Sequence, residues 1–308
     1  MLRSYALWIG VMLCLLAGCD PGEPTYKVDL RVRETPSVQQ EDHSITYAYL
    51  PQYSHTISYQ KHHQLVAYLR QKTGLNIRQI FPDTFDGHLE MVGQGKIDLS
   101  FTNPYIYIQM AHRYGAKAFA RIVEKEGGAR YKGQIICRAD NPNIHSLEDC
   151  RGKRWIAVDP WSGGGYLFPL TLFHDHGITR SDFQEIAFSP GPGGKQEKVV
   201  LAVCAGKYDI GTIRQGTLDV VVNKIDPRAI RVLAETNWYP GWVFSSRGGL
   251  DPEIVAAVKT ALLALDSKDP EHRPILEAAQ IVGVIASVDA DYDAVRDAVR
   301  QIDGPATP

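Results

Sequence analysis

The chain has 308 residues, which is enough for two domains of ordinary size. Its 33 lysines and arginines nearly balance its 35 aspartates and glutamates, and the formal net charge is −2. A chain so close to neutral has no general attraction for nucleic acid or for an anionic membrane surface, so any attraction for an anion must be local.

The first residues predict export rather than part of a folded domain. Arg3 precedes an apolar run at residues 5–16, which has the length of a signal-peptide core and is too short for a stable membrane span. The run ends in Leu-Ala-Gly-Cys at residues 16–19, which resembles a bacterial lipobox, so we expect cleavage to leave Cys19 as a lipidated N-terminus. An ordinary N-terminal membrane anchor is the alternative.

The segment that follows predicts where the protein is held. Asp20 comes directly after Cys19 and resembles the signal that keeps a lipoprotein on the inner membrane in enteric-type bacteria. Residues 20–43 are polar and contain proline but no periodic apolar pattern. We therefore predict a signal peptide at 1–19, a tether at 20–43, and a periplasmic protein that is lipid-anchored to the inner membrane.

The next part of the chain alternates strand-like and helix-like segments. Residues 45–50 read as a strand that Pro51 ends, and the segments after it are a helix at 58–73, a strand at 76–81, a helix at 85–93, a strand at 97–101, a helix at 105–114 and a strand at 116–123. Strands that alternate with helices at this interval indicate βαβ units and a mostly parallel sheet.

A second series begins after residues 127–133, where the pattern loosens. Its strands are expected at 134–138, 154–158, 182–188, 208–213 and 229–234, with helices at 166–173, 196–205 and 215–224. A strand at 242–245 and helices at 252–265 and 292–302 close the chain. We predict an α/β fold with lobe 1 at 44–133 plus 235–308, lobe 2 at 134–234, and a hinged cleft between the lobes.

A glycine-rich loop connects the strand at 154–158 to the helix that follows it. Residues 158–169 read VDPWSGGGYLFP, so Ser162 precedes Gly163, Gly164 and Gly165. Such a loop leaves backbone N–H groups unpaired at a helix N-terminus, where the helix dipole is positive. Without Cβ atoms an anion can approach the backbone, and Ser162 adds a hydroxyl donor. The alternative is a tight turn that binds no ligand.

Other loops are expected to meet this one at a cleft. Ligands of open parallel sheets gather at the carboxyl ends of the strands. The loops predicted there are residues 51–53, 102–105, 162–165, 189–196 and 213–215, and they come from both halves of the chain. This arrangement predicts a cleft that closes about a hinge.

The cysteines of the mature chain allow two interpretations. After the signal region the chain keeps Cys137, Cys150 and Cys204. One disulfide between Cys137 and Cys150 with a buried, inert Cys204 is the first reading, and binding of a metalloid by three thiols is the second.

The ten histidines form no cluster at metal-ligand spacing, so we predict no metal and no cofactor. No catalytic signature is evident, and we do not expect an enzyme.

Several motifs follow one another along the chain. They are the lipobox, Gly95-Lys-Ile-Asp98 with Phe-Thr-Asn-Pro-Tyr to 105, Tyr131 before a strand, Asp159-Pro160-x-Ser162-x-x-Gly165-Tyr166, and Ala202-Val-x-x-Gly206-x-x-Asp209. In this combination the chain resembles the phosphate/phosphite/phosphonate-binding proteins of bacterial ABC importers, and the resemblance runs from about residue 45 to the end of the chain. It implies a type 2 periplasmic binding-protein fold that closes on its ligand without chemistry.

The resemblance also implies a set of ligand contacts. The family holds its phosphonate group with a Ser-Thr-Ser run, which falls on Ser162, Gly163 and Gly164 before Gly165 and Tyr166, so one hydroxyl of three is kept. A family histidine and acidic residue fall on Gln196 and Glu197. The remaining candidates are Phe85 and Thr102 from the family pattern, Tyr53, Asn103 and Tyr131 from neighbouring loops, Trp161 as an aromatic cover for the ligand, and Lys195 and Arg214 as local positive charge.

We therefore predict a monomeric solute-binding lipoprotein that captures a small oxyanion, such as a phosphonate, phosphite or phosphate, for an ABC permease in the inner membrane. The alternative is an accessory protein that reports ligand occupancy to a membrane histidine kinase, including sensing of a metalloid through cysteine.

Overall fold

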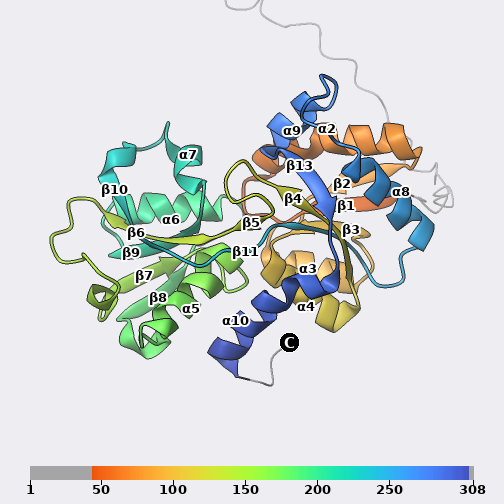
Figure 1. Ribbon diagram of the computed structural model, residues 1–308. Coiled ribbons are helices and arrows are strands. Elements are labelled where there is room, and N and C mark those ends of the chain that lie inside the picture. The colour runs from red at the N-terminus through yellow and green to blue at the C-terminus, as the bar shows by residue number, and fades with distance from the viewer. Residues whose placement is uncertain (1–43, 305–308) are drawn as a thin grey trace, which may run out of the picture. The chain divides into compact units, whose positions relative to one another are not determined.

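Two β-sheets organise residues 44–304, which are the residues that the computed structural model describes (Figure 1). The first sheet has six strands in the order β13-β4-β12-β3-β1-β2, and the second has five in the order β10-β6-β9-β7-β8. The predicted signal peptide, Cys19 and the tether lie outside the described residues.

The first sheet combines parallel and antiparallel strands. Its strands are β1 (Ile45–Tyr49), β2 (Ile77–Ile80), β3 (Leu99–Thr102), β4 (Lys117–Val123), β12 (Val243–Ser246) and β13 (Gly283–Ala286). β1 pairs in parallel with β2 and β3, whereas β12 runs antiparallel between β3 and β4. A strand from late in the chain is therefore built into the middle of the sheet.

Three helices of this first sheet begin where a short polar side chain caps them. Ser54 Oγ accepts the N–H of Ile57, and Thr84 and Asn103 cap the two helices that follow in the same way. The helices are α2 (His55–Thr73), α3 (Phe85–Gly93), α4 (Pro104–Tyr114), α8 (Pro252–Leu263), α9 (Arg273–Ala279) and α10 (Asp293–Asp303). No helix within residues 44–304 is long and apolar enough to cross a membrane.

The second sheet lies between two apolar cores. Its strands are β6 (Gly133–Arg138), β7 (Arg154–Ala157), β8 (Glu185–Phe188), β9 (Ile210–Arg214) and β10 (Ile230–Glu235). One core packs α5 (Phe168–Asp175) against the sheet around Trp155 and Phe173. The other packs α6 (Lys195–Cys204) against it, and the short α7 (Thr217–Val221) follows β9. The predicted α/β architecture is confirmed.

The prediction of mostly parallel sheets is wrong in detail. β6 pairs antiparallel with both β9 and β10, and β12 pairs antiparallel with β3 and β4. These are the strands next to the two places where the chain passes from one sheet to the other, so they enter each sheet against the βαβ direction. At the crossings a short ladder joins β5 (Arg130–Tyr131) to β11 (Tyr239–Pro240).

Other differences concern short elements. The sequence pattern did not predict α9 or β13, and it extended α7 by several residues. β8 begins three residues later than predicted, because a capping box at Thr179 turns residues Arg180–Asp182 into a short 3-10 helix.

The structure corrects the predictions about the cysteines. Cys137 and Cys150 are free thiols in one core of the second sheet, so the predicted disulfide is not formed in it. Burial raises the pKa of Cys150 to about 12, which keeps the thiol protonated and unreactive. Cys204 is only half-buried and packs at the core on the opposite face. A shared three-thiol site is therefore wrong, and no group of three or more His, Cys, Asp or Glu side chains in residues 44–304 is placed to hold a metal.

Two histidines are buried in the core around the first sheet. His62 Nδ1 lies 2.5 Å from Tyr47 Oη, and His88 Nε2 lies 2.9 Å from Ser100 Oγ. Burial lowers the pKa of each histidine to about 3, with Lys61 adding to the effect on His62. Both side chains are therefore neutral in the folded protein.

We expect these histidines to make the fold sensitive to acid. The unfolded chain takes up a proton at each histidine below about pH 6.5, whereas the folded chain does so only near pH 3. The free energy of unfolding should therefore fall as pH decreases from about 6.5, by up to about 1.4 kcal/mol per pH unit for each histidine. Urea unfolding at a series of pH values should show a shallower dependence for His88→Gln, and an unchanged one for the exposed control His145→Gln. An unchanged slope for His88→Gln would contradict this assignment.

Candidate functional site

The glycine loop joins β7 to α5 as predicted, and it forms a turn of π-helix over Gly163–Leu167. Ser162 Oγ accepts the N–H of Gly165 at 3.1 Å and so caps this turn. The hydroxyl of Ser162 still has its own proton to donate. The loop therefore forms the N-terminal end of the π-helical turn, where the helix dipole is positive, as the sequence predicted. The turn continues directly into α5.

The three glycines are required by packing inside the protein. A Cβ at Gly163 would overlap the hydroxyl of Tyr131, and one at Gly165 would overlap Val158. At Gly164 it would press on the Tyr131 ring and on Cβ of Arg214. The missing side chains thus let Tyr131 and Arg214 lie against the loop backbone, and direct contact of this backbone with a ligand stays a prediction.

Loops from the two sheets meet as predicted. The N–H of Lys195 donates to the carbonyl of Gln52 at 3.1 Å, and Asn103 Nδ2 donates to the carbonyl of Trp161 at 3.2 Å. Trp161 Nε1 also donates to Asp86 Oδ1 at 2.5 Å. Trp161 therefore contacts α3 from the other sheet, so its side chain has a role in joining the sheets in this structure.

Lys195 is brought to the loops, but its charge is already balanced. Its ammonium lies 2.6 Å from Asp159 Oδ2, and both side chains are buried. Burial raises the pKa of Asp159 despite this partner. The ammonium also lies 5.8 Å from the centre of the Phe85 ring. Lys195 therefore offers no uncompensated positive charge here.

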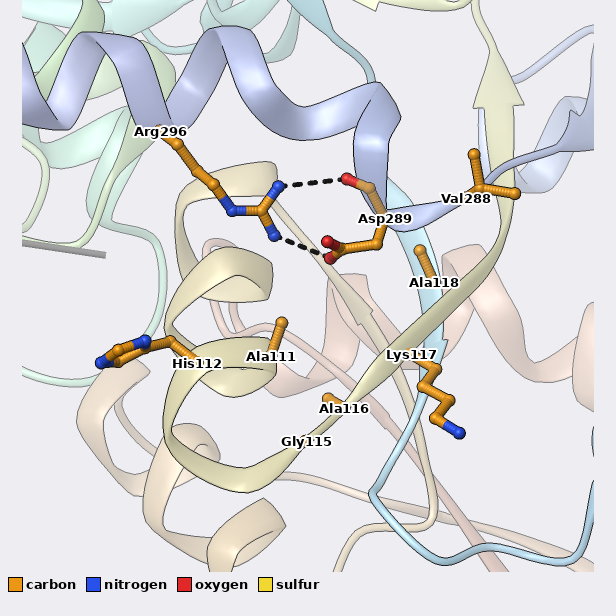
Figure 2. Close-up of a pocket in the computed structure, with 9 residues that line it drawn as sticks. All are labelled: Ala111, His112, Gly115, Ala116, Lys117, Ala118, Val288, Asp289 and Arg296. Carbon is orange, nitrogen blue, oxygen red and sulfur yellow. Dashed lines mark hydrogen bonds and ion pairs between the residues drawn. The ribbon is translucent and has the colours of Figure 1, made fainter.

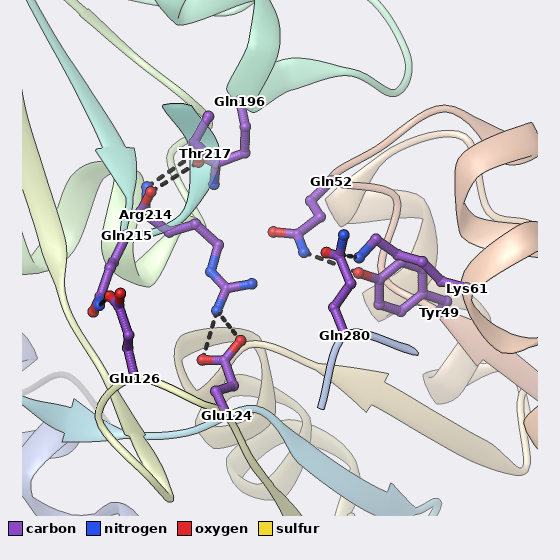
Figure 3. Close-up of polar contacts among 10 residues, drawn as sticks. All are labelled: Tyr49, Gln52, Lys61, Glu124, Glu126, Gln196, Arg214, Gln215, Thr217 and Gln280. Atoms are coloured by element: carbon purple, nitrogen blue, oxygen red, sulfur yellow. Dashed lines mark hydrogen bonds and ion pairs between the residues drawn. The ribbon is translucent and has the colours of Figure 1, made fainter. Parts of the chain in front are cut away.

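Arg214 is the buried cation at the centre of the junction between the sheets (Figure 3). Its Nη2 donates to both carboxylate oxygens of Glu124, at 2.7 and 2.9 Å. The guanidinium lies 5.5 Å from the centre of the Tyr131 ring and 5.7 Å from that of Trp242. Burial opposes the charge on Arg214, but the Glu124 carboxylate together with Tyr53 and Tyr49 outweighs it, and the pKa of Arg214 lies above its usual value.

Gln196 supports the backbone of Arg214, and its predicted role as a ligand contact stays a prediction. Its Oε1 accepts the backbone N–H of Arg214 at 3.0 Å and the hydroxyl of Thr217 at 3.3 Å. The buried amide thus ties the start of α6 to the end of β9 and fixes where the Arg214 side chain begins. Glu197 instead pairs with Lys224.

A second cation, Lys61 on α2, lies on the opposite side of the pocket (Figure 3). Its ammonium donates to Oε1 of Gln280 and lies 5.2 Å from the centre of the Tyr53 ring. Burial lowers the pKa of Lys61 to about 8, and the Arg214 charge adds to the effect. Lys61 is thus a buried cation held by a neutral amide.

Gln280 has a strained backbone. It ends α9 with φ of 59°, and within residues 44–304 it is the one residue other than glycine with a positive φ. This conformation costs a side-chain-bearing residue about 1 kcal/mol. Strain of this kind is concentrated at functional sites, and here it turns the Gln280 amide toward Lys61.

These residues line two adjoining spaces, which we call the polar pocket. The larger space, of about 280 Å³, is lined by Tyr53, Glu124, Glu126, Arg214, Asp219 and Gln280 among others. The smaller, of about 20 Å³, lies among Tyr49, Lys61, Glu124, Arg214, Trp242 and Gln280. The smaller space has room for about one water, whereas the larger one has room for a small solute.

Several buried polar atoms at this junction have no partner within the described residues. They are Oγ1 of Thr102, the Tyr131 hydroxyl, Nε of Arg214 and Nε1 of Trp242. Burying a polar group without a hydrogen bond is costly, so such groups call for an explanation. A bound solute at the junction would supply one, and Thr102, Tyr131 and Arg214 were candidates from the sequence.

Three of the predicted contacts lie elsewhere or are occupied. The Tyr166 hydroxyl accepts Nε of Arg180 at 3.1 Å, and its ring packs against Trp155 on the α5 side of the second sheet. Asn103 Oδ1 caps α4 by accepting the N–H of Ile106. Phe85 is buried beneath Lys195.

A pocket of about 600 Å³ lies on the first sheet, away from every predicted contact (Figure 2). Its floor comes from small residues at the end of α4, and its charged residues are the exposed Lys117 and Asp289 and the half-buried Arg296. That guanidinium is already neutralised, because it pairs with Asp289 at 2.7 Å and Asp293 at 2.8 Å. The larger volume therefore does not make it the better oxyanion site, and we place the candidate site at the polar pocket.

Sequence reasoning missed Lys61, Glu124 and Gln280. Lys61 and Gln280 are 219 residues apart, so no local pattern joins them. Glu124 follows β4 directly, at the start of the segment where the predicted pattern loosens. A charged residue at the first crossing between two lobes was the one signal that could have pointed to it.

Comparisons with known proteins identify the family of this chain. The family model described as ABC transporter, phosphonate, periplasmic substrate-binding protein matches residues 47–292. The phosphate-import protein PhnD of Mycolicibacterium smegmatis is 30% identical over 271 residues, which cover 82% of this chain and 84% of that one.

Two solved structures have the same fold. A binding-protein component of an ABC phosphonate transporter from Pseudomonas aeruginosa has a TM-score of 0.74 at 20% identity, covering 83% of this chain and 85% of that one. PhnD1 of Prochlorococcus marinus in complex with methylphosphonate also has a TM-score of 0.74, at 14% identity, covering 85% of this chain and 99% of that one.

The fold is therefore the two-lobed type 2 periplasmic binding-protein fold, as predicted. The family resemblance drawn from the motifs is confirmed. The chain belongs to the phosphonate-binding periplasmic proteins of ABC transporters.

Proposed function

We propose that this protein binds one small phosphorus oxyanion, a phosphonate, phosphite or phosphate, in the polar pocket, with Arg214 as its principal contact. The observation that carries the proposal is the buried Arg214 guanidinium, which lies at the junction of both sheets beside a space of about 280 Å³. A guanidinium suits a tetrahedral oxyanion because it can donate two parallel hydrogen bonds.

The surroundings of Arg214 favour the same ligand class. Lys61 supplies a second positive charge, Tyr53, which carries a hydroxyl group, lines the larger space, and the Tyr131 ring lies against Arg214. The glycine loop lies against Arg214 at Gly164, so its backbone N–H groups and Ser162 remain proposed contacts. A ligand held by both sheets would shift the population toward the closed form by its differential affinity for that form.

The partner that fits this role is the permease of an ABC importer. The M. smegmatis relative is a phosphate-import protein, and the family is defined by transport. We propose that the chain is a monomeric carrier without catalytic activity and that the permease recognises its ligand-bound form. A sensory role with a histidine kinase is not favoured by any contact in residues 44–304, and the separated thiols remove the metalloid version.

The first test is Arg214→Lys. A lysine cannot donate the paired hydrogen bonds of a guanidinium, so affinity for phosphate and for methylphosphonate should fall by about tenfold or more. Isothermal titration calorimetry on the full chain measures both ligands. Arg154→Lys is the matched control, because Arg154 also pairs with a carboxylate, that of Asp209, but lies outside the polar pocket. Wild-type affinity in Arg214→Lys would remove Arg214 from the site.

The second test uses pH. An anion beside Lys61 favours its charged form, so binding should become weaker as pH rises above about 8, where the free protein loses this charge. We expect affinity for methylphosphonate to fall about tenfold between about pH 8 and about pH 10. In Lys61→Met the affinity should depend on pH only through ionisation of the ligand itself. Lys72→Met, on the same helix, is the control and should show the wild-type pH dependence. A pH profile that Lys61→Met leaves unchanged would exclude Lys61.

We also propose that the carrier is held at the inner membrane by a lipid on Cys19. The apolar run and the small residues before Cys19 support this anchor. Cys19→Ser should move the protein from the membrane fraction to the soluble fraction after cell lysis, as seen by immunoblotting. Cys14→Ser, a thiol within the apolar run, is the control and should stay in the membrane fraction. Membrane retention of Cys19→Ser would refute the lipid anchor.

A further inference from the structure

The anion that Arg214 holds in this structure belongs to the protein itself. Both oxygens of the Glu124 carboxylate accept hydrogen bonds from Nη2 of Arg214, which is the kind of contact that a phosphorus oxyanion would make. Glu124 and Arg214 line both spaces of the polar pocket. The carboxylate therefore occupies part of the surface that a solute would use.

The charges around the larger space oppose an anion as long as this pair is intact. Glu124, Glu126 and Asp219 line it together with Arg214 and Lys125. Three carboxylates and two cations thus line this space. Glu124 already neutralises Arg214, which is the more buried of the two cations. An incoming dianion would meet net negative charge, whereas displacement of Glu124 would expose the guanidinium to it.

Glu124 is placed so that it can leave Arg214. Its side chain is 21% exposed, compared with 12% for Arg214, so solvent can reach the carboxylate. It also lines the 20 Å³ space that Lys61 lines, and Lys61 is held there by a neutral amide. A carboxylate that lost Arg214 would therefore find a second cation and water nearby, which limits the cost of leaving it unpaired.

The segment that carries Glu124 is one of the two connections between the sheets. Glu124 follows β4 directly and bridges to Gly128 in a tight turn, where its N–H donates to the Gly128 carbonyl at 2.8 Å. This turn leads through β5 to β6 of the second sheet. The competing carboxylate is thus anchored at the crossing between the two sheets.

We propose that Glu124 is an internal competitor that sets the affinity and charge preference of the site, and that an oxyanion binds by taking its place on Arg214. This rests on the proposed binding of a phosphorus oxyanion at the polar pocket. The ligand gains only the difference between its own contact with Arg214 and that of Glu124. The site therefore discriminates in favour of ligands that bind a guanidinium better than a carboxylate does.

The test compares Glu124→Gln with wild type, using methylphosphonate and inorganic phosphate as probes in calorimetry on the full chain. Glutamine keeps the shape but loses the charge that competes for Arg214, so both probes should bind about tenfold more tightly. Glu124→Asp keeps the charge but shortens the reach to Arg214, so its affinity should lie between the two. If Glu124→Gln does not give a cooperative thermal transition, Glu124→Asp carries the test by the same criterion.

Two matched controls separate this contact from general electrostatics. Glu126→Gln removes the same charge from the same pocket, but Glu126 contacts Gln215 rather than Arg214. It should strengthen binding by about threefold at most, since it changes only a screened charge. Glu235→Gln removes a carboxylate near the other crossing, where it pairs with Lys132 outside the pocket, and should leave affinity unchanged.

The outcomes distinguish this inference from the function on which it rests. Unchanged or weaker binding in a folded Glu124→Gln overturns the inference, and weaker binding would make Glu124 a ligand contact or a structural support of Arg214. An equal gain in Glu126→Gln also overturns it, because the effect would then be general charge. Whichever of these results the Glu124 and Glu126 variants give, the proposed function stands as long as wild type binds a probe and Arg214→Lys does not. If neither wild type nor Glu124→Gln binds any phosphorus oxyanion, both proposals fail.

Discussion

A guanidinium cannot be buried between two sheets without a counter-ion, and the junction of this protein is built around that constraint. Taking Arg214 out of water would cost several kcal/mol if it were left alone. Glu124 supplies the opposite charge, Tyr131 and Trp242 supply aromatic faces, and Gln196 fixes the backbone from which the side chain extends. The absence of a side chain at Gly164 is part of the same arrangement, because a Cβ there would press on Arg214. These contacts come from both sheets, so the burial of one side chain couples them.

The other charges near the cleft follow a similar pattern. Lys195 is buried against Asp159, and Glu197 is paired with Lys224. Buried charges must be paired in this way, and pairs of this kind leave little net field for a solute. Lys61 differs because its partner at the pocket is an amide. Recognition of an anion in such a site depends on which pairs can be opened, and less on how many cations the loops contain.

The sequence predicted the architecture well, because periodic apolar segments and caps are local signals. The order of strands and helices up to β10, the glycine loop between β7 and α5, and the crossings between the sheets were all evident from it. The direction of β12 and the existence of α9 and β13 were not evident from the sequence, because pairing between distant segments produces no local sequence pattern. Register and partner are decided by which apolar surface remains uncovered after the other strands have paired.

The proposed site was predictable only where it lies on loops next to strand ends. Tyr131 and Arg214 were candidates on this ground, and the structure brings their side chains together. Tyr166 lies in the π-helical turn, and its ring packs against Trp155 on the α5 side of the second sheet. Lys61 and Gln280 come from helices far apart in the chain, and their contact depends on packing that no spacing rule describes.

The strained backbone at Gln280 has a consequence for how this protein can evolve. Glycine adopts the left-handed conformation without strain, so glycine at position 280 would end α9 at a lower conformational cost. The same change would delete the amide that orients Lys61. With Lys61 in its proposed role, selection for a more stable fold and selection for solute capture act in opposite directions at one residue.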